Sequence, residues 1–206
     1  MDILSNLKHR YNKKDKAHLL VGICGRAGAG KTTLAKKISE KFKMHTIIYS
    51  GDWRFKHDSA ERKKLFQEKW KAGMNAYMYA INQYTWWDFE KIGIDLDDLL
   101  KSKAVIIKNA YDRETGKRDT TIELPDRYKS IILYENCILG GTEILEKLDL
   151  IILLNTPDEV CFSRMIDKDF GRRSMAEIAS RFLITSFSEN KFFTLFWHVY
   201  RNLSKN

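Results

Sequence analysis

Short runs of consecutive apolar residues alternate along the chain with longer segments in which apolar residues recur every three or four positions. Four of these runs are bounded by glycine or polar residues and therefore predict buried parallel strands. They lie at residues 18–24, 44–50, 130–134 and 150–154. Between the first two runs, apolar residues recur at helical spacing from Thr32 to Phe42 with lysines on the other face, which predicts an amphipathic helix.

The middle of the chain adds further helices and one hairpin. The segment 56–83 is highly charged, rich in aromatic residues and helical in pattern, and another helix begins at Asp95. Two short apolar runs at 104–107 and 121–124 flank a turn at Gly116 and predict a hairpin that projects from the main sheet. Two later helices are predicted, at 142–147 and at 157–169.

The alternation of strands and helices predicts an α/β fold, an open parallel sheet of about five strands with helices on both faces. No linker, repeat or low-complexity tract divides the chain, so we expect a single domain over residues 1–206. Within it we distinguish a basic N-terminal extension at 1–17, the hairpin at about 104–124 and a lid at about 164–174.

The composition supports a packed globular protein and leaves its partners open. The 206 residues are 44% hydrophobic and 12% aromatic with only two prolines, which argues against a disordered or fibrous chain. The 36 lysines and arginines against 27 acidic residues give a formal net charge of +9, which suits nucleic acid, an acidic membrane surface or phosphorylated small molecules. Because the basic residues are spread along the chain, we interpret them as solvated faces and expect no nucleic-acid partner.

We expect neither a membrane partner nor a disulfide framework. No run of about eighteen apolar residues occurs, and the N-terminal residues lack the apolar core of a secretory signal. The three cysteines, Cys24, Cys137 and Cys161, are widely spaced and form no CxxC pair. The expected location is therefore cytoplasmic, with reduced thiols.

One motif indicates the chemistry. Residues Gly25 to Thr32 read Gly-Arg-Ala-Gly-Ala-Gly-Lys-Thr and match GxxxxGK[ST] at every fixed position, between a predicted strand and a predicted helix. In that context backbone N–H groups point at phosphate oxygens, Lys31 reaches the β and γ phosphates, and Thr32 coordinates Mg²⁺. The residues expected on the nucleotide are Gly25, Gly28, Ala29, Gly30, Lys31, Thr32 and Thr33. The fold is thus expected to be that of a P-loop NTPase.

The segments that accompany a phosphate loop differ between GTPases, motor ATPases and kinases. A GTPase needs an Asn-Lys-x-Asp segment to recognise guanine, but beyond the loop the Asn-Lys pair at 190–191 is followed by two phenylalanines. A helicase or transporter ATPase needs a carboxylate pair after an apolar strand, and here the strand to Tyr134 is followed by the single Glu135. A small-molecule kinase needs a carboxylate beside the γ-phosphate and a mobile basic lid.

The chain has candidates for both kinase features. Asp52 follows the second strand at the edge where open α/β sheets place their ligands, and we expect it to be the general base, with a helix cap as the alternative. Glu135 ends another strand at that edge, where it holds the metal or helps to place the acceptor, or else is a helix cap or a surface charge. The candidate lid residues are Arg164, Lys168, Arg172 and Arg173, with Gly171 as a hinge. Their alternative role is a solvated helix end.

The order of these segments resembles the uridine kinase and phosphoribulokinase family of P-loop kinases over about residues 18–181. After the phosphate loop, Tyr49-Ser50-Gly51-Asp52 is similar to the family's strand that ends in a catalytic aspartate. The further segments that carry the resemblance are Trp87 to Leu100, Tyr111 to Arg118, Ile131 to Glu135, Asp149 to Thr156 and Arg164 to Asp169.

The resemblance implies a phosphotransferase that uses ATP and Mg²⁺ and whose basic lid closes over the nucleotide. It implies that Asp52 activates the acceptor hydroxyl and that Asp88, Tyr111 and Arg118 contact the acceptor. The chain departs from the pattern at Gly116, where pyrimidine-nucleoside members have a histidine, and at Asn136, where a glycine follows the glutamate.

The sequence thus predicts an ATP-dependent kinase that acts on a hydroxyl of a small nucleoside-like or sugar-like metabolite. The alternative is a nucleotide-binding regulatory protein without kinase activity, associated with RNA. The aromatic residues Tyr84, Trp86 and Trp87 either stack on a ring of the acceptor or pack in the core. The aromatic segment 192–200 is a candidate homodimer face.

Overall fold

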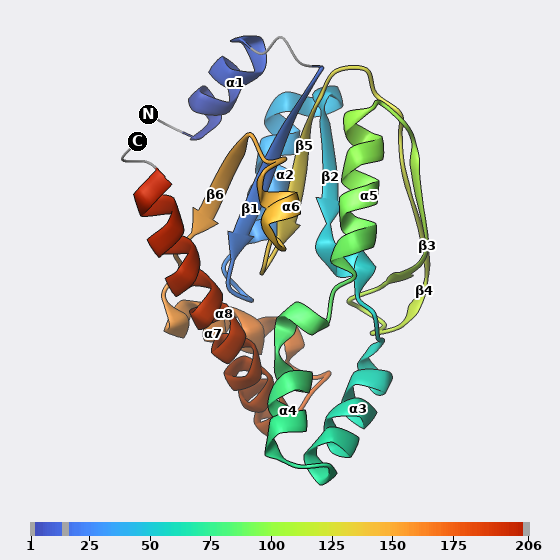
Figure 1. Cartoon of the computed structure of the whole chain (residues 1–206), viewed down its shortest axis with the longest axis vertical. Helices are drawn as coiled ribbons and strands as arrows, with labels where there is room; N and C mark the ends of the chain where they lie inside the picture. The colour runs from blue at the N-terminus through green and yellow to red at the C-terminus, as the bar shows by residue number, and fades with distance from the viewer. Residues whose placement is uncertain (1–2, 14–16, 204–206) are drawn as a thin grey trace.

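The computed structural model describes residues 3–13 and 17–203, and among these the side chains of all but Met44 and residues 194–203. Its centre is a parallel sheet of four strands (Figure 1). The strands are β1 (His18–Gly25), β2 (Thr46–Ser50), β5 (Ser130–Asn136) and β6 (Leu150–Leu154), in the order β2-β5-β1-β6. All residues of β1 and β5 are buried, as expected for central strands with helices on both faces.

The α/β class is confirmed, with a difference in strand number. The two short runs around Gly116 form a separate antiparallel pair, β3 (Val105–Tyr111) and β4 (Arg118–Leu124), beside the main sheet. The described sheet therefore has four strands where the sequence predicts about five. The strand predicted from residue 44 begins at Thr46, because Lys43–His45 form a 3-10 turn.

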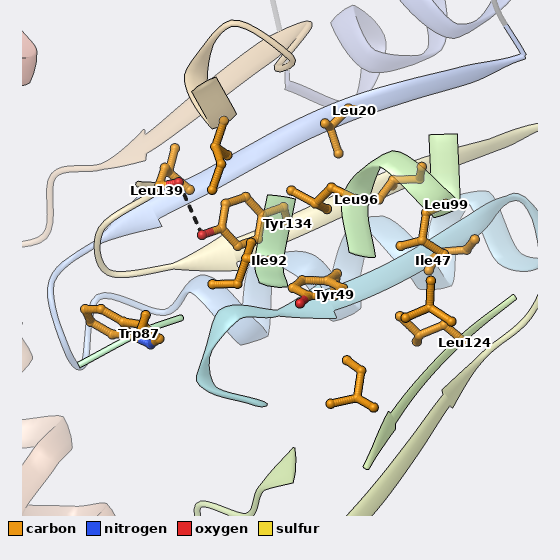
Figure 2. Close-up of a cluster of buried hydrophobic side chains, with 14 of the residues drawn as sticks. Leu20, Ile47, Tyr49, Trp87, Ile92, Leu96, Leu99, Leu124, Tyr134 and Leu139 are labelled. Carbon is orange, nitrogen blue, oxygen red and sulfur yellow. Dashed lines mark hydrogen bonds between the residues drawn. The ribbon is translucent and has the colours of Figure 1, made fainter. Parts of the chain in front are cut away.

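Side chains that alternate along β1 divide the core into two layers. Leu19, Val21 and Ile23 face the layer under α2 (Lys31–Phe42), whereas Leu20 and Cys24 face the layer under α5 (Phe89–Leu100). Figure 2 shows the second layer, in which Ile92 and Leu96 of α5 pack on Tyr49 and Tyr134 of neighbouring strands. The layer is completed by the short helix α6 (Thr142–Leu145) and by residues of the β3–β4 hairpin. The sheet is thus covered on both faces.

The N-terminal extension contributes to the first layer. Residues Ile3–Lys13 form α1, and its Leu7 is fully buried among the side chains of β1 and α2. The basic residues of this helix face outward, so its charge is solvated while its apolar side packs. Lys14 and Lys16, part of the same basic stretch, lie outside the described residues.

The charged segment 56–83, predicted to be helical, contains two helices. Asp58 caps α3 (Ser59–Lys71) in a capping box with Glu61, and α4 (Met74–Ile81) begins after Gly73, whose φ of 114° requires glycine. Both helices lie beyond the carboxyl edge of the sheet, beside α8 (Met175–Leu203) (Figure 1). They are joined to α5 by a 3-10 turn, Gln83–Thr85.

The C-terminal part of the chain runs from β6 into two helices. α7 (Asp158–Asp169) starts after Pro157 and is followed by a turn that leads into α8. Phe192 of α8 is buried in the chain's own core, 6.0 Å from the ring of Tyr84. The side chains of 194–200, the rest of the candidate dimer face, lie outside the described part. Within the described chain, no helix has the length and apolar character needed to cross a bilayer.

Candidate active site

The turn between β1 and α2 has a backbone that only glycine can adopt at two positions. Gly28 and Gly30 have φ values of 83° and 99°. At Gly28 an added Cβ would lie 2.4 Å from the carbonyl oxygen of Cys161 in α7. The loop is thus held against α7 by close backbone contact, a contact that the sequence motif does not reveal.

Lys31, the first residue of α2, points back into this loop. Its Nζ donates hydrogen bonds to the carbonyl oxygens of Gly25 and Arg26, both at 2.9 Å, and lies 3.2 Å from Cys137 Sγ. Burial alone would lower the pKa of Lys31, but the nearby Cys137, Glu189 and Glu135 outweigh burial and raise it. The lysine therefore remains charged inside the loop.

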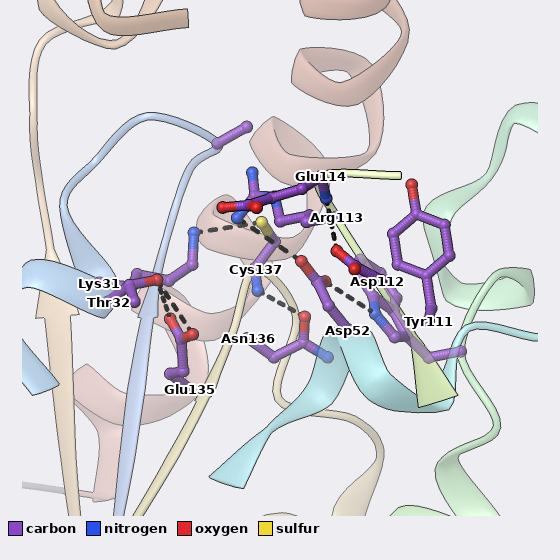
Figure 3. A network of polar contacts seen from close by, with 12 residues as sticks. Lys31, Thr32, Asp52, Tyr111, Asp112, Arg113, Glu114, Glu135, Asn136 and Cys137 are labelled. Atoms are coloured by element: carbon purple, nitrogen blue, oxygen red, sulfur yellow. Dashed lines mark hydrogen bonds and ion pairs between the residues drawn. The ribbon is translucent and has the colours of Figure 1, made fainter. Parts of the chain in front are cut away.

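Thr32 and Glu135 meet beside the loop. The hydroxyl of Thr32 donates to both carboxylate oxygens of Glu135 at 3.0 Å (Figure 3). Burial, followed by the charge of Asp52, raises the pKa of Glu135. A hydroxyl and a carboxylate are hard oxygen ligands of the kind that Mg²⁺ takes together with phosphate oxygens. Among the described residues, no cluster of three or more His, Cys, Asp or Glu side chains is arranged to hold a metal ion by itself.

Asp52 lies in a 3-10 turn, Gly51–Arg54, directly after β2. Its two carboxylate oxygens have different neighbours: Arg113 Nη1 lies 3.6 Å from Oδ2, and Trp87 Nε1 donates to Oδ1 at 3.4 Å. No side-chain hydrogen bond caps the 3-10 turn, and the following helix is capped by Asp58. The alternative interpretation of Asp52 as a helix cap is therefore wrong.

Sheet register brings these groups to one edge. Glu135 of β5 pairs with Ile23 of β1 on one side and with Ser50 of β2 on the other. The phosphate loop and the turn with Asp52 both begin within two residues of this row. Figure 3 shows the result, with Lys31, Thr32 and Glu135 on one side and Asp52 with Arg113 on the other.

The hairpin residues named from the resemblance have other partners besides any ligand. The hydroxyl of Tyr111 is 2.9 Å from Ser59 Oγ and accepts from Arg62 Nη2 at 3.2 Å. Arg118 donates to the carbonyl oxygen of Lys56 at 2.6 Å and thereby ties the hairpin to the segment before α3.

Asp88 is the N-cap of α5. Its Oδ1 accepts from the backbone N–H of Lys91 at 3.2 Å, and its Oδ2 lies 3.0 Å from Lys91 Nζ. Asp88 and Arg118 thus make structural contacts, and the ring of Tyr111 packs edge-on against Phe55.

The lid residues and the phosphate loop line one cavity of about 620 Å³. Its basic side chains, contributed by four parts of the chain, are Lys31, Lys37, Arg113, Arg164, Lys168, Arg172, Arg173 and Arg181. Asp169 is the one carboxylate among the lining residues, and it lies between 3.0 and 3.3 Å from Arg172, Arg173 and Arg181. All four predicted lid residues are therefore brought to the phosphate loop, and Arg164 reaches the carbonyl oxygen of Gly28 at 3.2 Å. Their interpretation as a solvated helix end is incomplete, because they share this cavity.

Three residues of the site were not identified from the sequence. Arg113 belongs to the hairpin segment of the resemblance but has no role in it, and Arg181 follows the predicted lid. Glu189 of α8 is buried and accepts from the backbone N–H of Ala27 in the phosphate loop at 3.3 Å and from Gln83 Nε2 at 3.3 Å. Glu189 shares the buried side of α8 with the polar Thr185 and Ser188, and its partner in the phosphate loop is 162 residues away in the chain, so the sequence carried no local signal for it.

Comparison with known proteins agrees with this geometry. A sequence model of the Phosphoribulokinase / Uridine kinase family matches residues 20–185. The chain is 26% identical over 164 residues to a uridine kinase of Listeria innocua, an alignment that covers 77% of this chain and 71% of that protein.

Solved structures show the same fold. A structure described as a possible uridine kinase from Bacillus stearothermophilus superposes with a TM-score of 0.59 at 21% identity, covering 88% of this chain and 90% of that one. A D-glycerate 3-kinase from Cryptococcus neoformans var. grubii superposes with a TM-score of 0.57 at 12% identity, covering 92% of this chain and 85% of that one. At these identities the structures support the fold alone.

Proposed function

Since the chain belongs to the phosphoribulokinase/uridine kinase family and is a phosphotransferase with a hydroxyl acceptor, we propose that it transfers the γ-phosphoryl group of ATP to a hydroxyl of a small nucleoside-like or sugar-like metabolite. The proposal rests on one observation, that three candidate functional side chains approach the same edge of the sheet. Lys31 approaches it from the loop after β1, Glu135 from the end of β5, and Asp52 from the turn after β2.

The nucleotide would bind with its triphosphate in the loop. The backbone N–H groups of residues 25–33 and the start of α2 favour negative charge, and Lys31 supplies a buried cation for the β and γ phosphates. The lid residues, Arg164, Lys168, Arg172 and Arg173, would neutralise the remaining phosphate oxygens. Positioning and charge neutralisation supply most of the rate enhancement in phosphoryl transfer.

Thr32 and Glu135 would hold Mg²⁺. Their oxygens already converge, because the Thr32 hydroxyl donates to both carboxylate oxygens of Glu135. When bound there, the cation would neutralise negative charge that develops on the phosphate oxygens.

Asp52 would accept the proton of the attacking hydroxyl. Arg113 and Trp87 hold its two oxygens in place from the hairpin and from the segment before α5. Tyr111 would contact the acceptor, whereas Asp88 and Arg118 would shape the pocket through the backbone contacts that they make. A positioned base of this kind contributes about 10²–10⁴ in rate.

The test is acceptor-stimulated ADP formation with a panel of nucleosides and sugar alcohols, measured on the full chain and on Asp52→Asn. We expect an acceptor that stimulates turnover, a loss of about 10²–10⁴-fold in kcat for the variant, and unchanged ATP affinity. Asp126→Asn, which removes an exposed carboxylate from the loop after β4, is the control and retains activity. Turnover stimulated only by RNA, or full activity of Asp52→Asn, would contradict the proposal and favour a regulatory nucleotide-binding protein.

A second variant tests the nucleotide half of the site. Lys31→Ala is expected to lose most ATP affinity and turnover, because it removes the buried ammonium group that lies inside the loop. Calorimetric titration with the magnesium salt of ATP measures the loss, and Lys36→Ala on the exposed face of the same helix controls for charge. Near-normal binding by Lys31→Ala would refute the assignment of the phosphate loop.

A further inference from the structure

We propose that Arg113 makes the reaction selective for the acceptor hydroxyl over water, because its ion pair with Asp52 has to open before any hydroxyl reaches the base. This inference rests on the proposed kinase function and names a specificity-determining residue of the same site. Arg113 lies in the hairpin turn between β3 and β4, and the family resemblance gives it no role.

The carboxylate of Asp52 has one fixed neighbour and one replaceable neighbour. Trp87 donates to Oδ1 at 3.4 Å, and its ring is 2% exposed and stacked on Phe55 with centres 5.1 Å apart, so this contact belongs to the core. Arg113 Nη1 lies 3.6 Å from Oδ2, which is longer than a hydrogen bond. Oδ2 is therefore the oxygen that an incoming hydroxyl would approach.

The side chain of Arg113 is free to move, although the turn that carries it is held. The side chain is 42% exposed, and Asp52 is its one ion-pair partner among the residues that the structure describes. The N–H of Gly116 donates to the carbonyl oxygen of Asp112 at 2.8 Å, and its own carbonyl oxygen accepts from the backbone N–H of Ser59 at 2.9 Å. Arg113 can thus exchange partners by rotation of its side chain while the hairpin stays in place.

The guanidinium of Arg113 stands at the boundary between the base and the phosphate cavity. The residues that line the cavity of about 620 Å³ include Arg113 with the phosphate loop and the lid, whereas Asp52 is not among them. The charge of Asp52 raises the pKa of Arg113, and the charge of Glu135 adds to this effect. On the lid, the pKa of Lys168 is lowered first by Arg113 and then by burial. Arg113 is therefore close both to the base beside it (Figure 3) and to the groups proposed to hold the nucleotide.

A bound triphosphate would give this guanidinium a second anion. An arginine has five N–H donors in a planar fork, so the group that faces Asp52 has further donors for a phosphate oxygen. The γ-phosphoryl group at Lys31 would lie in the cavity that Arg113 lines. Arg113 would then bridge the base and the γ-phosphate and occupy the space from which a nucleophile attacks.

Water and the acceptor differ in their ability to displace Arg113. A water molecule has only its own hydrogen bonds with which to separate the guanidinium from Oδ2. An acceptor also binds through the rest of its molecule, and this binding energy opens the ion pair and places the hydroxyl between Oδ2 and the γ-phosphate. Arg113 therefore sets the ratio of phosphoryl transfer to hydrolysis.

The two reactions have the same balance of bonds. The oxygen of the hydroxyl forms a bond to the γ phosphorus, and the bond from that phosphorus to the bridging oxygen of ADP breaks. The proton of the hydroxyl passes to Asp52, and ADP leaves. In hydrolysis a water molecule takes the place of the alcohol and the product is inorganic phosphate.

The experiment measures phosphate release by the full chain at saturating ATP and Mg²⁺ without any acceptor. Arg113→Met removes the cation and keeps most of the aliphatic stem. We expect it to hydrolyse ATP about tenfold or more faster than the parent, because Asp52 is then free to accept a proton from water. Lys108→Met removes an equal charge from an exposed position on β3 of the same hairpin and should hydrolyse ATP at the parent rate.

Two further variants separate this mechanism from a folding defect. In Asp52→Asn combined with Arg113→Met the hydrolysis should return to the parent rate or below, because the base is absent. Arg113→Lys retains a cation without the planar fork and should stay closer to the parent than Arg113→Met does. With an acceptor that stimulates turnover, the ratio of phosphorylated acceptor to inorganic phosphate should fall about tenfold or more in Arg113→Met.

Two results would overturn the inference: hydrolysis by Arg113→Met at or below the parent rate, or faster hydrolysis that persists in the double variant. Faster hydrolysis that depends on Asp52, in a chain that no acceptor of the panel stimulates, would support the role of Arg113 and contradict the kinase function. Acceptor-stimulated transfer with unchanged hydrolysis in Arg113→Met would do the reverse. The two proposals therefore fail separately.

Discussion

Glu135 shows how a single residue of a ligand site can lower the stability of the fold. The carboxylate is buried, with 6% of its surface exposed, and accepts a bond from Thr32. Its pKa is raised because burial disfavours the charged form and Asp52 lies nearby. Between the unfolded and the folded pKa the folded state holds more protons than the unfolded state, so stability falls as the pH rises through that window.

Replacement of Glu135 by glutamine should therefore stabilise the fold while it impairs the proposed metal site. We expect Glu135→Gln to be more stable than the parent at neutral pH by on the order of 1 kcal/mol, about 2–4 °C in the melting midpoint of a chain of this length. The difference in stability between Glu135→Gln and the parent should vanish at a pH below the ordinary pKa of glutamate, where the carboxyl group is protonated in both states. Thermal melts from pH 4 to 8 measure it, and a loss of stability at pH 8 would contradict this account of the carboxylate.

Arg113 and Glu189 show which site residues sequence reasoning does not reach. Each acts through a partner far away in the chain, and a basic or acidic residue on a helix is as often solvated as bound. The glycines, Lys31 and Thr32 were identified because a local motif dictates their conformation and spacing. Asp52 and Glu135 were identified because a parallel sheet brings the ends of its strands to one edge.

At the scale of elements, α7 and the turn that follows it bring the cationic residues to the phosphate loop. The turn contains Gly171 at φ 80°, and Phe170 beside it is 76% exposed. Asp169 gathers three arginines at this point. The ion pairs of Asp169 thus hold the start of this turn, whereas Phe170 is exposed and contributes little apolar packing. A segment with these properties can open locally.

Nucleotide should protect this segment from proteolysis. With saturating ATP analogue and Mg²⁺, we expect tryptic cleavage between Lys168 and Arg173 to slow by on the order of tenfold or more, because opening requires the phosphate contacts to break. Cleavage at Lys63 and Lys64 of α3, read in the same digest by mass spectrometry, is the internal control. Equal rates at the lid with and without nucleotide would contradict its closure over the phosphates.

Secondary structure was predictable where a sequence pattern is compatible with only one type of element. The buried strands and the amphipathic helix α2 agree with the sequence-based expectation, since runs and 3.6-residue periodicity are local. The charged segment 56–83 was expected as one helical stretch, although Gly73 divides it. The hairpin was predicted to project from the main sheet, and in the structure its strands β3 and β4 pair with each other as a separate sheet.

At the scale of the whole molecule, α8 connects the α3–α4 region to the phosphate loop. Glu189 is 1% exposed and bonds both to Ala27 of the loop and to Gln83, which is itself 1% exposed. Gln83 also donates to the carbonyl oxygen of Thr185, and its backbone N–H donates to Ser188. The phosphate loop and the 3-10 turn Gln83–Thr85 are thereby linked through one buried carboxylate.

Removal of the Glu189 carboxylate should weaken nucleotide binding, although this side chain contacts the backbone of the phosphate loop and not the nucleotide itself. Glu189→Ala removes the side-chain acceptor of the Ala27 N–H and one of the two acceptors of Gln83 Nε2, which costs about 1–3 kcal/mol, and we expect both a lower melting midpoint and about tenfold weaker ATP binding. Lys191→Ala, two residues further on the same helix and exposed, should match the parent. Unchanged ATP affinity in Glu189→Ala, with lowered stability alone, would limit α8 to a packing role.

The arrangement of loop and carboxylate can be tested by a crystal structure with Mg²⁺ and a non-hydrolysable ATP analogue. The account predicts β and γ phosphate oxygens within hydrogen-bond distance of Lys31 Nζ, the metal on Thr32 and Glu135, and the carboxylate of Asp52 directed at the γ-phosphate. Phosphates bound away from Lys31, or an Asp52 side chain turned out of the cleft, would contradict it.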